Sequence, residues 1–146
     1  FAPNFAVGAV LMMRFAAEAS RVMQSAEIIE LHHSGKVDAP SGTALSTAKL
    51  MQEGRSLPFD AHETQKFTLE GVRGGNAGGI RIHSVRLPGI VAHQEVIFGG
   101  QGQTLTIRHD SYGRDSFVPG VIMAVKEVVT RTELVYGLDR IMGLGD

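Results

Sequence analysis

The chain has 146 residues, a net charge of −1, 43% hydrophobic residues and no cysteine. A chain of this length and composition can bury one sizeable core. The balanced charge, without a basic run, argues against nucleic acid and anionic membrane surfaces as partners. The lack of cysteine excludes disulfides and thiolate metal sites, and it fits a reducing compartment.

The longest apolar stretch, Val7 to Ala17, contains Arg14. It is also shorter than the ~20 residues that a membrane span needs. No signal peptide is recognisable. We therefore expect a cytoplasmic protein that does not contact a membrane.

The first half of the chain is predicted to alternate helix, strand and helix. Apolar residues at helical spacing predict a long helix over Phe5 to Met23. The short, β-branched run from Ala26 to His32 predicts a largely buried strand. A second helix is expected over Thr43 to Gln52, with Ser41 or Thr43 as its N-cap.

The second half is predicted to be mostly strand. A polar loop over residues 54–61 precedes a strand over Thr64 to Leu69. Three longer β-rich runs follow, and their short glycine-containing linkers predict antiparallel neighbours. An amphipathic helix over Phe117 to Val129 closes the chain. The fold class is α+β, a mostly antiparallel or mixed sheet with helices on one face. The three runs are Ile80 to Leu87, Ile90 to Phe98 and Gln103 to His109.

The glycine-rich segment Gly71 to Gly79 is predicted to be mobile or tightly turned. Its composition suggests a phosphate loop, but it precedes a strand, whereas a dinucleotide-binding turn follows a strand and opens a helix. We therefore do not assign it to nucleotide binding.

Other titratable residues are interpreted structurally. Three histidines lie in predicted strands without metal-ligand spacing, and we expect them to be packed or interface residues. Asp38 is expected to organise its loop through backbone hydrogen bonds. Asp110 and Asp115 flank Arg114 and are expected to pair with it near the surface. The histidines are His83, His93 and His109.

The segment from Glu30 to Ala44 carries the densest chemistry in the sequence. His32 and His33 end the predicted strand, where neighbouring side chains point to opposite faces, so only one can enter a given cleft and a chelating pair is not expected. The helix start after Pro40 offers free N–H groups to an anion, and with Lys36 in the same loop the expected anion is a carboxylate. Histidine suits proton transfer near neutrality.

Each of these features also has a structural interpretation. A Ser-Gly-Thr sequence before a helix is usually only a cap, and a histidine at a strand end is usually packed or solvated. The presence of proton-transfer groups and an anion site in one loop favours the functional interpretation.

The same segment resembles the signature of the dihydrodipicolinate reductase family of lysine and diaminopimelate biosynthesis, through the pattern His-His…Lys…Asp-Ala-Pro-Ser-Gly-Thr. The similarity extends through nearly the whole chain. Residues 1–8 resemble the hinge that leaves the family's nucleotide-binding domain, and residues 79–86 and 99–120 resemble its later strands and closing helix. The resemblance implies an oxidoreductase that reduces 4-hydroxy-tetrahydrodipicolinate (dihydrodipicolinate) to tetrahydrodipicolinate with NADPH or NADH.

The resemblance also implies roles for individual residues. His32 would be the general acid/base, and Lys36 the second catalytic residue. Phe5 and Arg114 would face the nicotinamide cofactor, and no metal is implied. Ser34-Gly35 fills a spacer that often holds a basic or ring-containing residue in relatives, so substrate affinity is expected to differ. The implied substrate-binding residues are His33, Lys36, Ser41, Gly42 and Thr43, the last three receiving a carboxylate.

A division of labour along the chain follows from the resemblance. Residues 1–113 are expected to form a substrate-binding and oligomerisation domain, and a homotetramer built through the sheets is implied. Residues 114–146 are expected to return through the hinge and pack on a nucleotide-binding domain of ~100–150 residues. The chain opens on Phe1 and has no Gly-x-Gly-x-x-Gly after a strand, so we expect that domain to be missing and the isolated chain to be inactive. The preference between NADH and NADPH stays open.

Two other functions stay open at this stage. The chain could be a non-catalytic module that binds small dicarboxylates or serves assembly, although intact His32 and Lys36 favour an enzyme. A metal-dependent hydrolase is less well supported, because His32 and His33 are adjacent and no Asp or Glu stands at ligand spacing.

Overall fold

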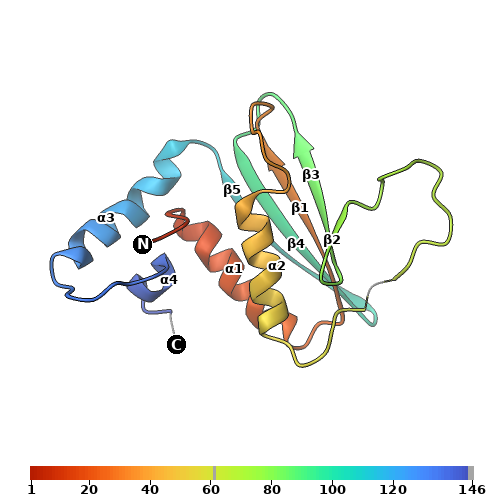
Figure 1. Cartoon of the computed structure of the whole chain (residues 1–146), viewed down its shortest axis with the longest axis horizontal. Helices are drawn as coiled ribbons and strands as arrows, with labels where there is room; N and C mark the ends of the chain where they lie inside the picture. The colour runs from red at the N-terminus through yellow and green to blue at the C-terminus, as the bar shows by residue number, and fades with distance from the viewer. Residues whose placement is uncertain (61, 145–146) are drawn as a thin grey trace.

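A computed structural model describes residues 1–60 and 62–144 (Figure 1). Five strands form one mixed sheet in the order β2-β3-β1-β4-β5, and helices α1 and α2 lie side by side over one of its faces. The α+β prediction is confirmed. The elements are α1 (Val7–Ser20), β1 (Ser25–His32), α2 (Gly42–Glu53), β2 (Gly75–Ala77), β3 (Ile80–Arg86), β4 (Ala92–Gly100), β5 (Gln103–Ser111), the 3-10 helix η1 (Arg114–Phe117), α3 (Val118–Val128) and α4 (Leu138–Ile141).

One predicted strand is wrong. Residues 64–69 form an irregular loop that projects from the body of the domain (Figure 1). Phe67 and Leu69 are 52% and 69% exposed. Their alternating pattern therefore finds no neighbouring strand within the described chain to pack against.

The predicted pairing of the next two strands is also wrong. β3 and β4 are not neighbours, because β1 lies between them, parallel to β3 and antiparallel to β4. The linker of residues 87–91 crosses two strand spacings, or about 9.6 Å, well within the reach of about 17 Å for an extended chain of that length. The predicted pairing of the following two strands is confirmed, since β4 and β5 are antiparallel neighbours.

Cross-strand register arranges the side chains of the helix-covered face in rows. The row through Ile28 is apolar and forms part of the core beneath α1 and α2. The next two rows, toward the end of β1, are mostly polar. The apolar row contains Ile82, Ile28, Val96 and Ile107; the first polar row contains Ser84, Glu30, Gln94 and His109; the second contains Arg86, His32, Ala92 and Ser111.

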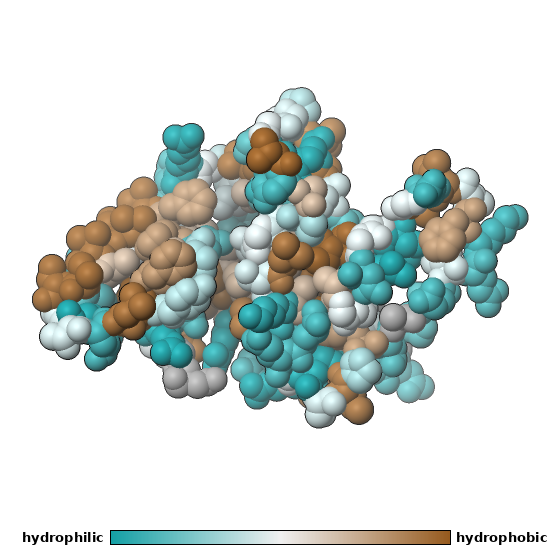
Figure 2. Space-filling view, viewed as in Figure 1, coloured by the Kyte–Doolittle hydropathy of each residue, from teal (hydrophilic) through white to brown (hydrophobic). Residues whose placement is uncertain are grey.

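The C-terminal elements leave the sheet. Helix α3 touches the N-terminal segment at Gly120, where an added Cβ would stand 2.1 Å from the Phe5 carbonyl oxygen. Leu138 of α4 is buried beside it. The rest of α3 extends outward and carries a hydrophobic surface (Figures 1 and 2). Across residues 1–60 and 62–144, no helix combines the length and apolar character needed to cross a bilayer.

Candidate active site

A cavity of about 280 Å³ lies at the polar end of the sheet. This volume is near the lower end of the ~300–1,000 Å³ typical of small-molecule sites. Its walls come from the N-terminal segment, α1, β1, α2, β4, β5 and η1, and they include Phe5, His32, Thr43, Gln94 and His109. Segments far apart in the sequence therefore meet around one space.

His32 is held in one orientation at the end of β1. Its Nδ1 lies 2.5 Å from Glu30 Oε2, and its side chain is 15% exposed. Because a carboxylate only accepts hydrogen bonds, Nδ1 carries the proton and Nε2 is left for a bound molecule. Burial lowers the pKa of His32; the Glu30 carboxylate opposes this, and Lys36 and Arg86 add to it. The net shift is downward, so the imidazole is neutral at neutral pH.

Glu30 is fully buried and was not recognised from the sequence as a functional residue. Arg86 donates to both of its carboxylate oxygens at 2.8 and 2.9 Å, and the Ser41 N–H donates at 3.2 Å. Burial alone would raise the pKa of Glu30, but hydrogen bonds from Arg86, Ser84 and His32 outweigh it and hold the pKa below its usual value. The sequence does contain a signal that could have identified Glu30, because it is a glutamate at an inward-facing position of a strand predicted to be buried.

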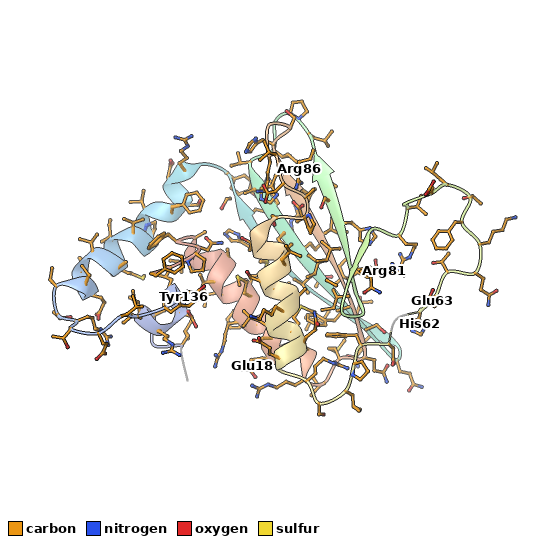
Figure 3. The ribbon with its side chains drawn as sticks, viewed as in Figure 1. Glu18, His62, Glu63, Arg81, Arg86 and Tyr136 are labelled. Carbon is orange, nitrogen blue, oxygen red and sulfur yellow. The ribbon has the colours of Figure 1, made fainter. Side chains whose placement is uncertain are left out.

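Arg86 fastens the loop between β1 and α2. It lies at the end of the sheet beside that loop (Figure 3). Besides its ion pair with Glu30, it donates to the Asp38 carbonyl at 2.7 Å. The two charged partners are 56 residues apart in the sequence. The pairing therefore depends on the parallel register of β1 and β3, which the sequence did not predict.

The N-terminus of α2 is open to solvent. Ser41 is the N-cap, since its Oγ accepts from the Ala44 N–H at 3.1 Å. Gly42 is exposed, and a Cβ added there would meet nothing within 4 Å. Among the described residues, no acceptor faces the N–H groups of Gly42 and Thr43. The helix terminus can therefore receive an anion.

Several of the predicted site residues do not line the cavity. Lys36 pairs with Asp38, with Nζ 2.6 Å from Oδ1. His33 and Arg114 are exposed and do not line the cavity, and neither do Lys36, Ser41 and Gly42. The structure thus brings His32, Thr43 and Phe5 to one space, with Lys36 on the adjoining loop.

Residues from β4 and β5 complete the walls. Gln94 donates from Nε2 to Thr47 Oγ1 at 2.8 Å, which ties the sheet to α2. The His109 ring lies against α1 at Gly8, where a Cβ would stand 2.4 Å from the ring carbon Cδ2. Burial lowers the pKa of His109, so this imidazole is also neutral at neutral pH.

The predicted pairing of Asp110 with Arg114 is wrong. Asp110 binds Arg108 and accepts a hydrogen bond from Nδ1 of His93 at 2.6 Å. Asp38, predicted to act through backbone hydrogen bonds, does make a hydrogen bond between its carboxylate and its own backbone, and the same carboxylate also binds Lys36. Within the part of the chain that the structure describes, no three His, Asp or Glu side chains gather as a metal site would require.

These features define a domain that can hold a small anion beside an imidazole able to carry a proton. The family model for the C-terminus of dihydrodipicolinate reductase matches residues 8–142. The chain belongs to this family and corresponds to its C-terminal part.

Two relatives and one solved structure illustrate the similarity. The 4-hydroxy-tetrahydrodipicolinate reductase of Lysinibacillus sphaericus is 58% identical over 97% of this chain and 53% of its own length, and that of Geobacillus kaustophilus is 62% identical over the same shares. The dipicolinate-bound dihydrodipicolinate reductase from Paenisporosarcina sp. TG-14 is 55% identical, with a TM-score of 0.88 over 96% of this chain and 53% of its own. The chain thus spans about half the length of these proteins.

Proposed function

We propose that this chain is the substrate-binding and proton-transfer part of an NAD(P)H-dependent reductase that converts 4-hydroxy-tetrahydrodipicolinate to tetrahydrodipicolinate in lysine and diaminopimelate biosynthesis. The observation that carries the proposal is that the oriented His32 ring and Thr43, in the first turn of α2, line one cavity, with the exposed Gly42 beside Thr43. The similarity to a reductase that binds dipicolinate supports a dicarboxylate as the ligand.

In this proposal the loop between β1 and α2 binds the substrate. Ser41, Gly42 and Thr43 receive one carboxylate at the helix N-terminus, where the partial positive charge and free N–H groups favour an anion. His33 and Lys36 complete the substrate contacts. The substrate carboxylate competes with Asp38 for Lys36, whose ammonium lies on the same loop.

His32 acts as the general acid. The 4-hydroxyl group of the substrate leaves as water, which gives an unsaturated imine. Nε2 is the ring nitrogen not used by Glu30, so it is the atom that then delivers a proton to the carbon next to the one that receives hydride. A bound dianion beside the ring favours its protonated form and opposes the effect of burial. Lys36 supplies a second proton or the charge that directs the first.

NADH or NADPH supplies the hydride when bound. Phe5, which lines the cavity, and Arg114, which begins η1, are the residues of this chain proposed to face its nicotinamide ring. The relatives are about twice as long as this chain, and we place most of the cofactor contacts in the remaining half.

Binding of dipicolinate tests the substrate site directly. Titration calorimetry should detect dipicolinate, and pyridine-2-carboxylate should bind more weakly because it lacks the second carboxylate. Gly42→Ala should weaken dipicolinate binding, because its methyl group points into space that is empty in this chain but that the ligand would occupy. Gly75→Ala, an exposed glycine with equally free surroundings on β2, is the matched control. Equal affinity of both variants and the parent chain would contradict the assigned site.

We propose that the uncovered face of the sheet joins copies of the chain into a homotetramer. That face carries half-buried apolar side chains, Ile29, Leu31 and Ile97 among them, next to ion pairs such as Arg108 with Glu95. An apolar surface of this kind is typical of an interface between subunits. Light scattering of the full-length cytoplasmic protein should give the mass of a tetramer, and Ile97→Glu should lower it.

We further propose that residues 1–113 act as the substrate and assembly domain, while residues 114–146 pack on the nucleotide-binding part. Helix α3 exposes a continuous apolar surface (Figure 2), which includes Val118, Val121, Ile122, Val125 and Val128. A short helix without a packing partner is only marginally stable in water. Amide exchange in α3 should therefore be slow in the full-length protein and fast in the isolated chain.

A further inference from the structure

One carboxylate, that of Glu30, contacts both halves of the proposed site. It is fully buried, accepts from His32 Nδ1 through Oε2, and accepts from the Ser41 N–H through Oε1. Arg86 donates to both oxygens, so the carboxylate cannot turn without breaking several hydrogen bonds at once. The position of the imidazole and the position of the α2 N-terminus are therefore set by the same group.

The hydrogen bonds also anchor the loop on both sides of the turn that leads into α2. Arg86 holds the Asp38 carbonyl on one side of the loop, and Glu30 holds the Ser41 backbone on the other. Between these anchors lies the Ala39–Pro40 segment that leads into α2. We propose, on the basis of the proposed function, that Glu30 is a positioning residue that keeps His32 and the carboxylate-binding end of α2 in one fixed geometry.

The charged groups around His32 give this role a measurable signature. On its own strand and loop, Glu30 favours the protonated ring and Lys36 disfavours it; from β3, Arg86 disfavours it as well. From β4 and β5, the cavity also receives His93 and His109. Loss of the negative charge at Glu30 therefore removes a contribution that raises the pKa of His32, while the contributions that lower it remain.

The same strand supplies a matched control. Glu27 lies on the opposite face of β1, where it binds Arg73 and His83, with its Oε2 2.7 Å from His83 Nε2. It thus repeats the combination of a glutamate, an arginine and a histidine without touching the cavity. A change at Glu27 reports on the general effect of losing such a carboxylate from β1.

Glu30→Gln in the full-length protein tests the inference through the pH dependence of turnover. We expect turnover at neutral pH to fall by about 10- to 100-fold, the range seen when the hydrogen-bond partner of a metal-bound histidine is removed. The decline of activity with rising pH, which reports deprotonation of His32, should move to lower pH. Glu27→Gln should leave the position of that decline unchanged.

A titration of labelled histidine by NMR gives a readout that does not require activity. In Glu30→Gln the His32 resonance should titrate at a lower pH than in the parent protein, and in Glu27→Gln it should not move. If Glu30→Gln fails to fold because Arg86 is left unpaired, the double variant Glu30→Gln/Arg86→Gln takes its place. Removal of Arg86 offsets part of the effect, but Glu30 contributes more to the pKa of His32 than Arg86 does, so the titration should still move to lower pH. A shift no larger than in Glu27→Gln would overturn the inference. A parent protein without reductase activity would instead refute the proposed function, while the NMR titration would still decide the role of Glu30.

Discussion

The two ends of the helix-covered sheet face differ in chemistry although they share the same strands. At one end, Ile28 and its cross-strand partners pack beneath α1 and α2. Two residues further along β1, Glu30 occupies the equivalent inward position, and Arg86 pairs with it. A strand that alternates sides places both residues toward the helices. The difference therefore lies in the side chains and not in the backbone.

Stability alone does not explain the polar end. Removing an ion pair from water costs several kcal/mol per ion, and apolar replacements of similar volume are often neutral or stabilising. The apolar row through Ile28 and the other buried apolar residues packed with it already supply the core of the domain. What the polar rows add is a fixed imidazole, an anchored loop and an open helix terminus, all of which a binding site requires. The comparison thus separates residues that stabilise the fold from residues that organise the site.

The largest effect expected on function is at His32. In the full-length protein, His32→Gln should lower turnover by roughly 10²–10⁴-fold, the usual contribution of general acid–base catalysis. Lys36→Ala should lower it comparably, and cofactor binding should barely change in either variant. Steady-state kinetics and cofactor titration measure this. Dicarboxylate binding without any turnover in the parent protein would instead support the non-catalytic binding module.

A substitution at the apolar end should lower the stability of the fold without changing the binding site. Ile28→Ala removes a fully buried side chain and should lower the free energy of unfolding by about 2–5 kcal/mol. Dipicolinate affinity should be unchanged under conditions where the variant is folded. Urea unfolding and calorimetry check the two parts. Val22→Ala, at a residue that is 81% exposed, is the control and should cost less than about 0.5 kcal/mol. A large loss of affinity in Ile28→Ala would mean that the two ends are not separable.

The sequence predicted most of the apolar end. Apolar residues at helical spacing identified α1, and composition with a capping signal identified α2. The short β-branched run predicted a buried β1, and β-rich runs between turn residues identified β3, β4 and β5. The sequence also predicted the N-cap of α2 to within two residues. These features depend on local patterns, which a single sequence contains.

Long-range features were not predictable in the same way. The insertion of β1 between β3 and β4 depends on a pairing between distant segments, and the short linker at residues 87–91 is compatible with either arrangement. The Glu30–Arg86 pair follows from that insertion, so it was missed together with it. The projecting loop at residues 64–69 has the alternation of a strand but no partner to pair with in the described chain. The three-dimensional arrangement of the strands, and not the local propensity of the sequence, determines these three features.

A smaller effect is expected at the boundary between fold and site. Ser41→Ala removes the oxygen that accepts from the Ala44 N–H, and loss of an N-cap typically costs about 1 kcal/mol. Dipicolinate affinity should fall as well, because the same residue begins the anion-binding turn. Ser46→Ala, an exposed serine further along α2, should change neither quantity. A Ser41→Ala variant with full affinity and lower stability would restrict this residue to a capping role.

The smallest expected effect is a pH dependence of stability that arises from the histidines of the polar end. Burial holds the pKa of His109 below its usual value, so the unfolded chain binds this proton more readily than the folded one. The stabilisation is therefore complete above the ordinary pKa of histidine and is lost as the pH falls through the lower, folded-state value. Free energies of unfolding by urea at about pH 7.5 and 5.5 should show this decrease.

His109→Gln should make the decrease smaller without abolishing it, since the pKa of His32 is lowered mainly by burial too. His62→Gln, at an exposed histidine of the projecting loop (Figure 3), should retain the parent decrease. An unchanged pH dependence in His109→Gln would show that the polar rows do not set the acid stability of the domain.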